Sequence, residues 1–325
     1  MHISERIIEN RPIIAILGST ASGKTSAAIN LAQSLPGEII SADSMAVYRG
    51  LDIGTAKPTS AQQALIPYHL IDVADPIEEF QVSQFQTLAK AAHEQIKQRG
   101  MWTIVAGGTG FYVKALLDDM SLTSSPRSPE IRDELEAMSV KHGPGHLHEY
   151  LTRVDAVAAN RIHPNDKLRL VRALEVFLVT GIPISEHQAI DQAQRKSLLS
   201  IKFGLFLDDA ELHRRIETRV ELMIKEGFLQ EVQNLMGVGL SGLEPAMTGL
   251  GYKELVLHLR GDLRLEDAIE EIKKRTRQYA KRQRTWFKAD KEIMWVDVTH
   301  LEPDAISEQL LRLISDHMNS RSTGR

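Results

Sequence analysis

The chain has 325 residues, of which 42% are hydrophobic and 25% charged, so it can bury a sizeable core. The charged segment 1–12 lacks the apolar stretch of a signal peptide, and no apolar run is long enough to span a membrane, which predicts a cytoplasmic protein with no membrane partner. The absence of cysteine excludes disulfides and cysteine-based zinc sites, and a net charge of -4 gives no general indication of nucleic-acid binding.

A strand is predicted at 13–17, and a loop with the pattern G-x-x-x-x-G-K-[ST] follows it, before a predicted helix at 24–34. Backbone N–H groups of such a loop turn towards an anion, and the helix N-terminus adds positive potential. We predict a bound diphosphate or triphosphate, with Lys24 on a phosphate oxygen and Thr25 helping to hold Mg²⁺. The alternative is an ordinary glycine-rich turn. The phosphate loop comprises Gly18, Ser19, Thr20, Ala21, Ser22, Gly23, Lys24 and Thr25.

Short β-branched runs continue the alternation of strands and helices. Strands are predicted at 38–41, 69–73 and 102–106, with a helix at 82–99. This alternation predicts an α/β fold, a P-loop NTPase-like parallel sheet flanked by helices.

The Ser/Pro-rich connector 121–129 interrupts this alternation. Helices without an intervening strand are predicted at 129–142, 146–157, 166–180 and 184–196. A strand at 199–207 and helices at 210–236 and 265–288 then resume the core. We therefore predict a first core segment at 1–118, an all-helical insertion at 119–198, and a second core segment at 199–325.

Polar residues follow two of the predicted strands, where ligands of open parallel sheets bind. Asp43 follows the second strand and is a candidate proton acceptor or metal partner; the alternative is an aspartate that caps a turn. Thr109 lies in a Gly-Gly-Thr-Gly loop after the fourth strand, which lacks the full dinucleotide pattern and by itself favours a tight turn.

These motifs together resemble the tRNA dimethylallyltransferase family, the bacterial tRNA isopentenyltransferases. The resemblance covers nearly the whole chain, and its specific part is the block 43–58 in combination with the C-terminal block. The matching blocks are 18–25, 41–45, 47–58, 69–73, 107–109, 160–166, 172–176 and 280–283.

The resemblance implies transfer of a dimethylallyl group from dimethylallyl diphosphate to N6 of the adenosine immediately 3′ of the tRNA anticodon. It implies Mg²⁺ as cofactor, Asp43 as general base, Thr109 beside it, and Lys24 with Arg219 on the diphosphate. Helical spacing alone places Arg215 and Arg219 on one helix face. The alternative to diphosphate binding is that this face is solvated and forms i, i+4 ion pairs. The role of Arg215 is left open.

The segment 273–291 contains nine Lys or Arg against one acidic residue, which favours phosphate binding along one helix face, although a solvated face is the alternative. Trp286 and Phe287 either stack on a base or anchor this helix, and anchoring is favoured. The resemblance implies tRNA contacts at Asp43, Ser44, Met45, Ala46, Thr109, Arg132, Leu168, Arg169, Leu170, Val171, Arg172, Thr248, Gly249, Leu250, Gly251, Tyr252, Lys253, Lys281, Arg282, Gln283, Arg284, Thr285, Trp286, Phe287 and Lys288.

Two positions depart from the family pattern. Many relatives have Gln where Ala46 stands and a Pro-Gln pair where Lys167-Leu168 stands, so specific polar contacts to tRNA are expected to be missing there. We expect a monomer that grips the anticodon stem-loop with its helical insertion.

Other functions share parts of this pattern. A small-molecule or nucleoside kinase, a free-adenylate prenyltransferase and a nucleotide-dependent binding module would each use the phosphate loop. A metal site at His142, His146 and His148 is a weaker hypothesis than a surface turn, and His163 is also read as a turn residue.

Overall fold

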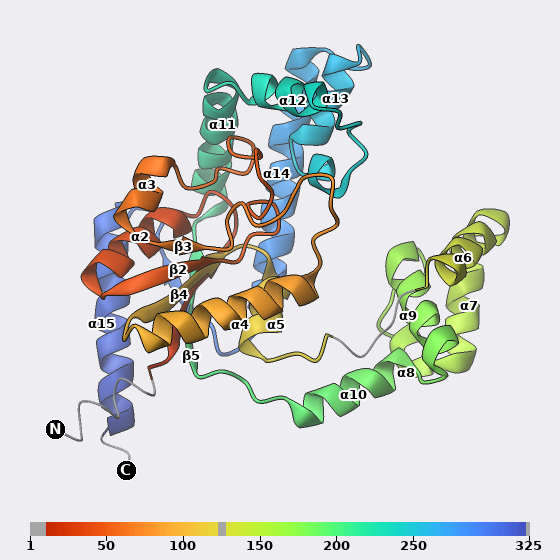
Figure 1. The fold of residues 1–325 in the computed structure, drawn as a ribbon, viewed down its shortest axis with the longest axis horizontal. Helices are drawn as coiled ribbons and strands as arrows, with labels where there is room; N and C mark the ends of the chain where they lie inside the picture. The colour runs from red at the N-terminus through yellow and green to blue at the C-terminus, as the bar shows by residue number, and fades with distance from the viewer. Residues whose placement is uncertain (1–10, 123–127, 323–325) are drawn as a thin grey trace. The chain divides into compact units, whose positions relative to one another are not determined.

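The computed structural model describes residues 11–122 and 128–322 (Figure 1). Its described strands form one parallel sheet in the order β3-β2-β4-β1-β5-β6. The predicted α/β parallel sheet is therefore confirmed. The strands are β1 (Ile13–Gly18), β2 (Gly37–Ser41), β3 (Tyr68–His69), β4 (Trp102–Gly107), β5 (Ser200–Phe206) and β6 (Met294–Asp297).

The chain divides into two compact units. One, called the sheet unit, runs up to Leu117 and resumes at Leu198; the other, called the insertion unit, is Asp118–Ser197. Helices of the sheet unit are α2 (Lys24–Ser34), α3 (Ser60–Leu65), α4 (Val82–Gln98), α5 (Gly110–Leu117), α11 (Asp209–Lys225), α12 (Phe228–Gly237), the 3-10 helix η1 (Pro245–Thr248), α13 (Tyr252–Leu259), α14 (Leu265–Lys288) and α15 (Pro303–Ser322). Those of the insertion unit are α6 (Pro129–His142), α7 (Pro144–Val154), α8 (Ala156–Ala159), α9 (Lys167–Thr180) and α10 (Ile184–Gln194).

Both faces of the sheet are buried, as the continuous apolar run of β1 predicts. Successive side chains of a strand point to opposite faces, so Ile13, Ala15 and Leu17 enter one hydrophobic core while Ile14 and Ile16 enter the other. The first core includes residues of α4, α5, α11 and α14, and the second includes residues of α2 and α15 (Figure 1). The sheet is thus a rigid layer whose carboxyl edge can position a site.

The insertion unit has a hydrophobic core of its own. Leu135 of α6, Leu151 of α7 and Leu174 of α9 are almost completely buried in it. Its described residues contain no strand, and the connector residues 123–127 lie outside the described part of the chain.

Three predicted elements were wrong in extent. The strand at 69–73 ends at His69, because Leu70 and Asp72 adopt left-handed conformations with φ of 64° and 57° that cannot continue a strand. The single helix at 210–236 is two helices, interrupted at Gly227 with φ of 103°. The helix at 146–157 ends at Val154, since Asp155 caps α8.

No helix among the described residues is both long and apolar enough to cross a membrane.

Candidate active site

The phosphate loop lies between β1 and α2, as predicted, and its backbone requires special conformations. Gly23 at the start of α2 has a φ of 89°, and a Cβ on Gly18 would lie 2.6 Å from the carbonyl oxygen of Leu205. Ser22 Oγ is buried and has no hydrogen-bond partner among the described residues. An unsatisfied hydroxyl inside a loop of this geometry fits the binding of an oxyanion.

Two cations border the loop. Lys24 Nζ donates a hydrogen bond of 2.5 Å to the carbonyl oxygen of Ser19. Burial, followed by the positive charge of Arg219, lowers the pKa of Lys24 to about 7. Burial also lowers the pKa of Arg219, while the charge of Asp43 opposes this shift. Both cations have lost solvation, and they repel each other. Binding of an anion between them is therefore favoured, because the anion offsets both effects.

Asp43 follows β2 and has one carboxylate oxygen engaged locally. Its Oδ1 accepts hydrogen bonds from Met45 N at 2.8 Å and Ala46 N at 3.3 Å. Thr109, after β4, accepts a bond from Ser44 N at 3.0 Å and donates one to Ser44 Oγ at 3.2 Å. The turn-capping role foreseen as the alternative for Asp43 is therefore present, and it fixes the orientation of the carboxylate.

Helix α14 supplies a further wall of the site. Gln283 accepts a hydrogen bond from Thr20 N at 2.8 Å and donates one to the carbonyl oxygen of Gly108 at 2.9 Å. Tyr279 lies beside Thr109 and Gln283, and burial, followed by the charge of Asp43, raises the pKa of Tyr279 to about 12. The phenol therefore stays protonated beside the aspartate.

Most of these groups line one cavity of about 360 Å³, although Thr109 is not among its lining residues. Lys24, Thr25, Asp43, Arg219 and Tyr279 all contribute to its wall. A second cavity of about 610 Å³ also reaches Lys24, Thr25 and Arg219, so the two spaces meet at the phosphate loop. The apolar part of the first cavity is formed by Met45, Ile216, Val220, Met223, Phe228 and Ile272.

The residues predicted to contact tRNA differ in their surroundings. Thr248, Gly249, Leu250 and Tyr252 line the first cavity, although the Tyr252 side chain is buried and donates a hydrogen bond of 2.6 Å to Glu231. Gln283 is likewise buried. The side chains of Tyr252 and Gln283 are therefore enclosed within the protein, whereas Thr248 is exposed.

In the insertion unit, Arg132 and Arg172 both form ion pairs with the buried Glu175, at 3.1 Å and 2.7 Å. Leu170 and Val171 belong to the core, whereas Leu168 is 78% exposed. The residues that line the first cavity all belong to the sheet unit.

Helix α14 is anchored by Phe287, which is buried, as favoured from the sequence, while Trp286 is 44% exposed and packs against Gly110. The basic helix face predicted within 273–291 is partly neutralised, because Arg277 pairs with Glu217 at 3.0 Å and Arg284 with Asp209 at 2.5 Å. Lys281, Arg282 and Lys288 form no ion pair among the described residues.

The histidine hypotheses yield no metal site. The rings of His142 and His146 are 5.1 Å apart, and His148 Nε2 contacts the carbonyl oxygen of Ala159. Within the described residues, no three His, Cys, Asp or Glu side chains form a group that could hold a metal. His163 Nδ1 accepts a hydrogen bond from Asn165 N, as expected in a turn.

Sequence reasoning missed several residues of the site. Tyr279 is separated from Thr276 and Gln283 by three and four residues, and this helical spacing could have placed it on the cavity face. Lys57 lies inside the matching block 47–58, but the sequence alone indicates no function for it. Glu231 gave no local signal, because its backbone partners Asp52, Ile53 and Gly54 lie more than 170 positions earlier in the sequence.

A family model described as IPP transferase matches residues 46–290. A tRNA dimethylallyltransferase from Desulforudis audaxviator is 46% identical over 288 residues, 88% of this chain and 92% of the relative. The corresponding protein of Natranaerobius thermophilus is 43% identical over 314 residues, which cover 96% and 94% of the two chains.

Solved structures give the same result. The tRNA isopentenylpyrophosphate transferase of Bacillus halodurans superimposes with a TM-score of 0.71 at 38% identity, covering 96% of this chain and 98% of that one. A eukaryotic dimethylallyltransferase acting on tRNA gives 0.81 at 31% identity, covering 96% and 80%. These likenesses confirm the predicted P-loop NTPase-like fold. The chain belongs to the IPP transferase family, whose curated relatives named above are tRNA dimethylallyltransferases.

Proposed function

We propose that this protein transfers a dimethylallyl group from dimethylallyl diphosphate to N6 of the adenosine immediately 3′ of the anticodon in tRNA, and releases diphosphate. The observation that carries the proposal is that one cavity contains both a phosphate loop and the Asp43 carboxylate. An anion-binding end and a proton-accepting end in the same cavity suit alkyl transfer from a diphosphate to an amine.

At the diphosphate end, the phosphate loop, Lys24 and Arg219 hold the leaving group. Breaking the allylic C–O bond places negative charge on the diphosphate, and fixed N–H groups and cations stabilise that charge as it develops. The described residues offer no cluster of carboxylates for Mg²⁺. A Mg²⁺ ion here would be held by the Thr25 hydroxyl together with diphosphate oxygens, and would add positive charge opposite the leaving group.

At the acceptor end, Asp43 takes the proton of the adenine amino group. Its Oδ1 is fixed by two backbone N–H groups, and Oδ2 accepts no hydrogen bond from the described residues, so it is available for the amine. Thr109 and Tyr279 orient the base beside it. A neutral exocyclic amine is a weak nucleophile, so holding it against the reacting carbon contributes much of the rate enhancement.

The apolar wall provides room for the five-carbon group. Val220, Met223, Phe228 and Ile272 border the cavity without a polar side chain among them. Apolar surroundings exclude water, which would otherwise compete with the amine for the allylic carbon.

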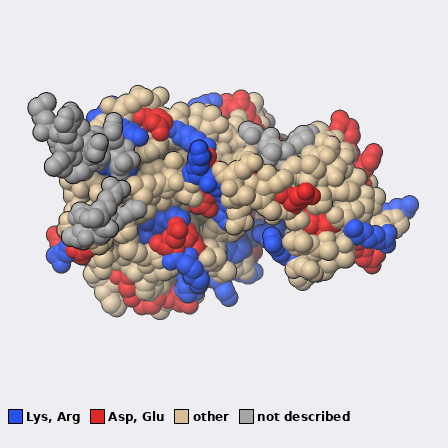
Figure 2. Space-filling view, turned by 90° about the horizontal axis from the view of Figure 1, so that it is seen from below, with Lys and Arg blue, Asp and Glu red and all other residues tan. Residues whose placement is uncertain are grey.

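For tRNA, the cations of α14 that have no ion-pair partner among the described residues are the natural phosphate ligands: Lys281, Arg282 and Lys288. Figure 2 shows basic and acidic side chains interspersed on the face in view, not one continuous basic surface. We expect binding to use phosphate contacts to these cations, with the helical insertion gripping the anticodon stem. The target base leaves its stack to reach Asp43.

The test is nucleoside mass spectrometry on unmodified tRNA incubated with the protein, Mg²⁺ and dimethylallyl diphosphate. We expect an adenosine that gains one C₅H₈ unit. Asp43→Ala should lower the rate of this gain by about 100-fold or more, since general acid–base catalysis typically contributes about 10²- to 10⁴-fold. Asp316→Ala, at an exposed position of α15 that lines neither cavity, is the control. A parallel reaction with ATP alone that yields ADP, together with no gain in adenosine mass, would favour a kinase instead.

A further inference from the structure

The two cavities meet beside a segment without regular secondary structure, residues 52–58, which we call the neck loop. Its residues Ala56, Lys57 and Pro58 line both cavities. Lys24 and Arg219 line both cavities as well. The neck loop and the cations Lys24 and Arg219 thus border the same space. The position of the neck loop therefore determines how much room is left for a diphosphate bound to these two cations.

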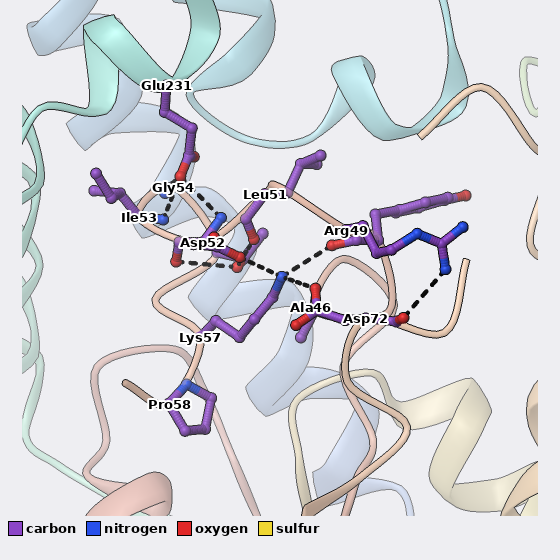
Figure 3. Close-up of polar contacts among 12 residues, drawn as sticks. Ala46, Arg49, Leu51, Asp52, Ile53, Gly54, Lys57, Pro58, Asp72 and Glu231 are labelled. Carbon is purple, nitrogen blue, oxygen red and sulfur yellow. Dashed lines mark hydrogen bonds and ion pairs between the residues drawn. The ribbon is translucent and has the colours of Figure 1, made fainter. Parts of the chain in front are cut away.

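Glu231 of α12 fixes the first half of the neck loop (Figure 3). Its Oε2 accepts hydrogen bonds from Asp52 N at 2.9 Å and Ile53 N at 2.7 Å, and its Oε1 accepts one from Gly54 N at 3.2 Å. The Tyr252 hydroxyl donates a fourth bond, of 2.6 Å, to Oε1. Four donors that converge on one carboxylate form a strong anchor, because hydrogen bonds to a charged acceptor are about twice as strong as neutral ones.

Lys57 fixes the second half. Its side chain is 3% exposed, and its ammonium lies 2.5 Å from Asp52 Oδ1 and 2.6 Å from Asp72 Oδ1 (Figure 3). It also donates a hydrogen bond of 2.9 Å to the carbonyl oxygen of Tyr48. All three ammonium donors have acceptors, so Lys57 is not a free cation for a phosphate although it borders both cavities.

The two anchors are linked through Asp52. Its backbone N–H binds Glu231 and its carboxylate binds Lys57. Asp72, the other partner of Lys57, is held in a left-handed conformation with φ of 57°. A non-glycine residue in this conformation is strained, which requires surrounding contacts to maintain it. The bonds that orient Asp43 and Thr109 involve none of these anchors.

We propose that Glu231 and Lys57 are positioning residues for the diphosphate donor, which they serve by holding the neck loop opposite Lys24 and Arg219. This inference rests on the proposed function for the identity of the donor. Loss of either anchor lets residues 56–58 move, which weakens donor binding. Transfer from bound donor is affected less, because Asp43 and Thr109 keep their own contacts.

The experiment compares Glu231→Ala and Lys57→Met with the wild type in prenyl transfer and in calorimetric titration with inorganic diphosphate and Mg²⁺. We expect KM for dimethylallyl diphosphate and Kd for diphosphate to rise about tenfold or more, since displacements of about 1 Å at a reacting site have effects of this size. KM for tRNA and kcat should change by less than about threefold.

Two matched controls separate positioning from general stability. Lys202, on β5, is also a buried lysine held by two carboxylates, Asp290 and Glu292, each at 2.9 Å, but it borders neither cavity. Lys202→Met should lower the melting temperature as Lys57→Met does while leaving donor KM unchanged. Gln230→Ala, at an exposed position next to Glu231 on α12, should change neither quantity.

Milder variants cover the case in which an anchor variant does not fold. Glu231→Gln replaces one oxygen with an NH₂ group and leaves two of the four donors without an acceptor, and Tyr252→Phe removes one donor, so each should raise donor KM by less than Glu231→Ala. Anchor variants that lose thermal stability but bind diphosphate as the wild type does would overturn the inference. The diphosphate titration decides this even if the wild-type protein transfers no prenyl group, which would contradict the proposed function alone.

Discussion

At the scale of single residues, the site depends on charges that are partly removed from water. Lys24 and Arg219 line the same cavity. Burial, followed by the positive charge of Arg219, lowers the pKa of Lys24 and so disfavours its protonated form. A bound diphosphate reverses this effect, because it replaces lost solvation and favours the protonated amine. The empty and occupied sites therefore differ in the protonation of Lys24.

This difference predicts proton uptake on donor binding. Because the pKa of Lys24 is lowered to about 7, most of the free protein carries neutral Lys24 at pH 8. The diphosphate raises that pKa, so binding takes up a proton, and affinity falls by up to about tenfold per pH unit above 7. Calorimetry at pH 8 in two buffers of different ionisation enthalpy measures the uptake, and Lys24→Met should abolish it. Equal binding enthalpies in the two buffers for the wild type would refute the assignment.

At the scale of elements, α14 connects parts of the site that are far apart in sequence. Gln283 joins the phosphate loop at Thr20 N to the loop after β4 at the carbonyl oxygen of Gly108. A Cβ on Gly108 would lie 2.2 Å from Gln283 Nε2, so this contact also requires glycine. The helix thus acts as a brace across the carboxyl edge of the sheet.

We expect Gln283→Leu to leave two backbone groups without partners and to cost about 2 kcal/mol of unfolding free energy. It should also weaken diphosphate binding, because Thr20 belongs to the phosphate loop. Urea denaturation and diphosphate titration measure the two effects, and Gln278→Leu, at an exposed position of the same helix, is the control. If Gln283→Leu weakened only tRNA binding, Gln283 would contact tRNA directly and would not brace the loop.

Much of this arrangement could be predicted from the sequence, because its signals are local. The phosphate loop stands between a strand and a helix, and Asp43 and Thr109 directly follow strands, so spacing alone indicates a common edge. Local patterns could not show that Glu231 binds the backbone of residues 52–54 or that Leu70 and Asp72 adopt left-handed conformations after β3. Such contacts depend on tertiary packing, which periodicity does not encode.

At the scale of the whole molecule, the chain consists of two units with separate cores. The buried Glu175 of the insertion unit accepts hydrogen bonds from Arg132 and Arg172. Burial acts to raise the pKa of Glu175, but the bonds from Arg172 and Arg132 outweigh it and hold this pKa below its usual value. The two arginines therefore stabilise the unit, whether or not they also contact RNA.

Glu175→Ala should destabilise the insertion unit by about 2 kcal/mol, since hydrogen bonds to charged groups contribute about this much. All three tryptophans, Trp102, Trp286 and Trp295, lie in the sheet unit. When thermal unfolding is monitored by far-ultraviolet circular dichroism, the part of the signal that comes from the insertion unit should therefore be lost at a lower temperature. Tryptophan fluorescence, which reports the sheet unit, should keep the wild-type transition temperature. Identical shifts of both signals would mean that the two units unfold as one cooperative structure.

The central claim is that one cavity joins a diphosphate to an adenosine of tRNA, and mapping the product tests it most directly. After incubation with the protein, dimethylallyl diphosphate and Mg²⁺, the tRNA is cut with a base-specific ribonuclease, and the masses of its fragments are measured by mass spectrometry. We predict a gain of one C₅H₈ unit only in the fragment with the adenosine immediately 3′ of the anticodon. An unchanged mass in that fragment, or a gain in free adenylate and not in tRNA, would contradict the account.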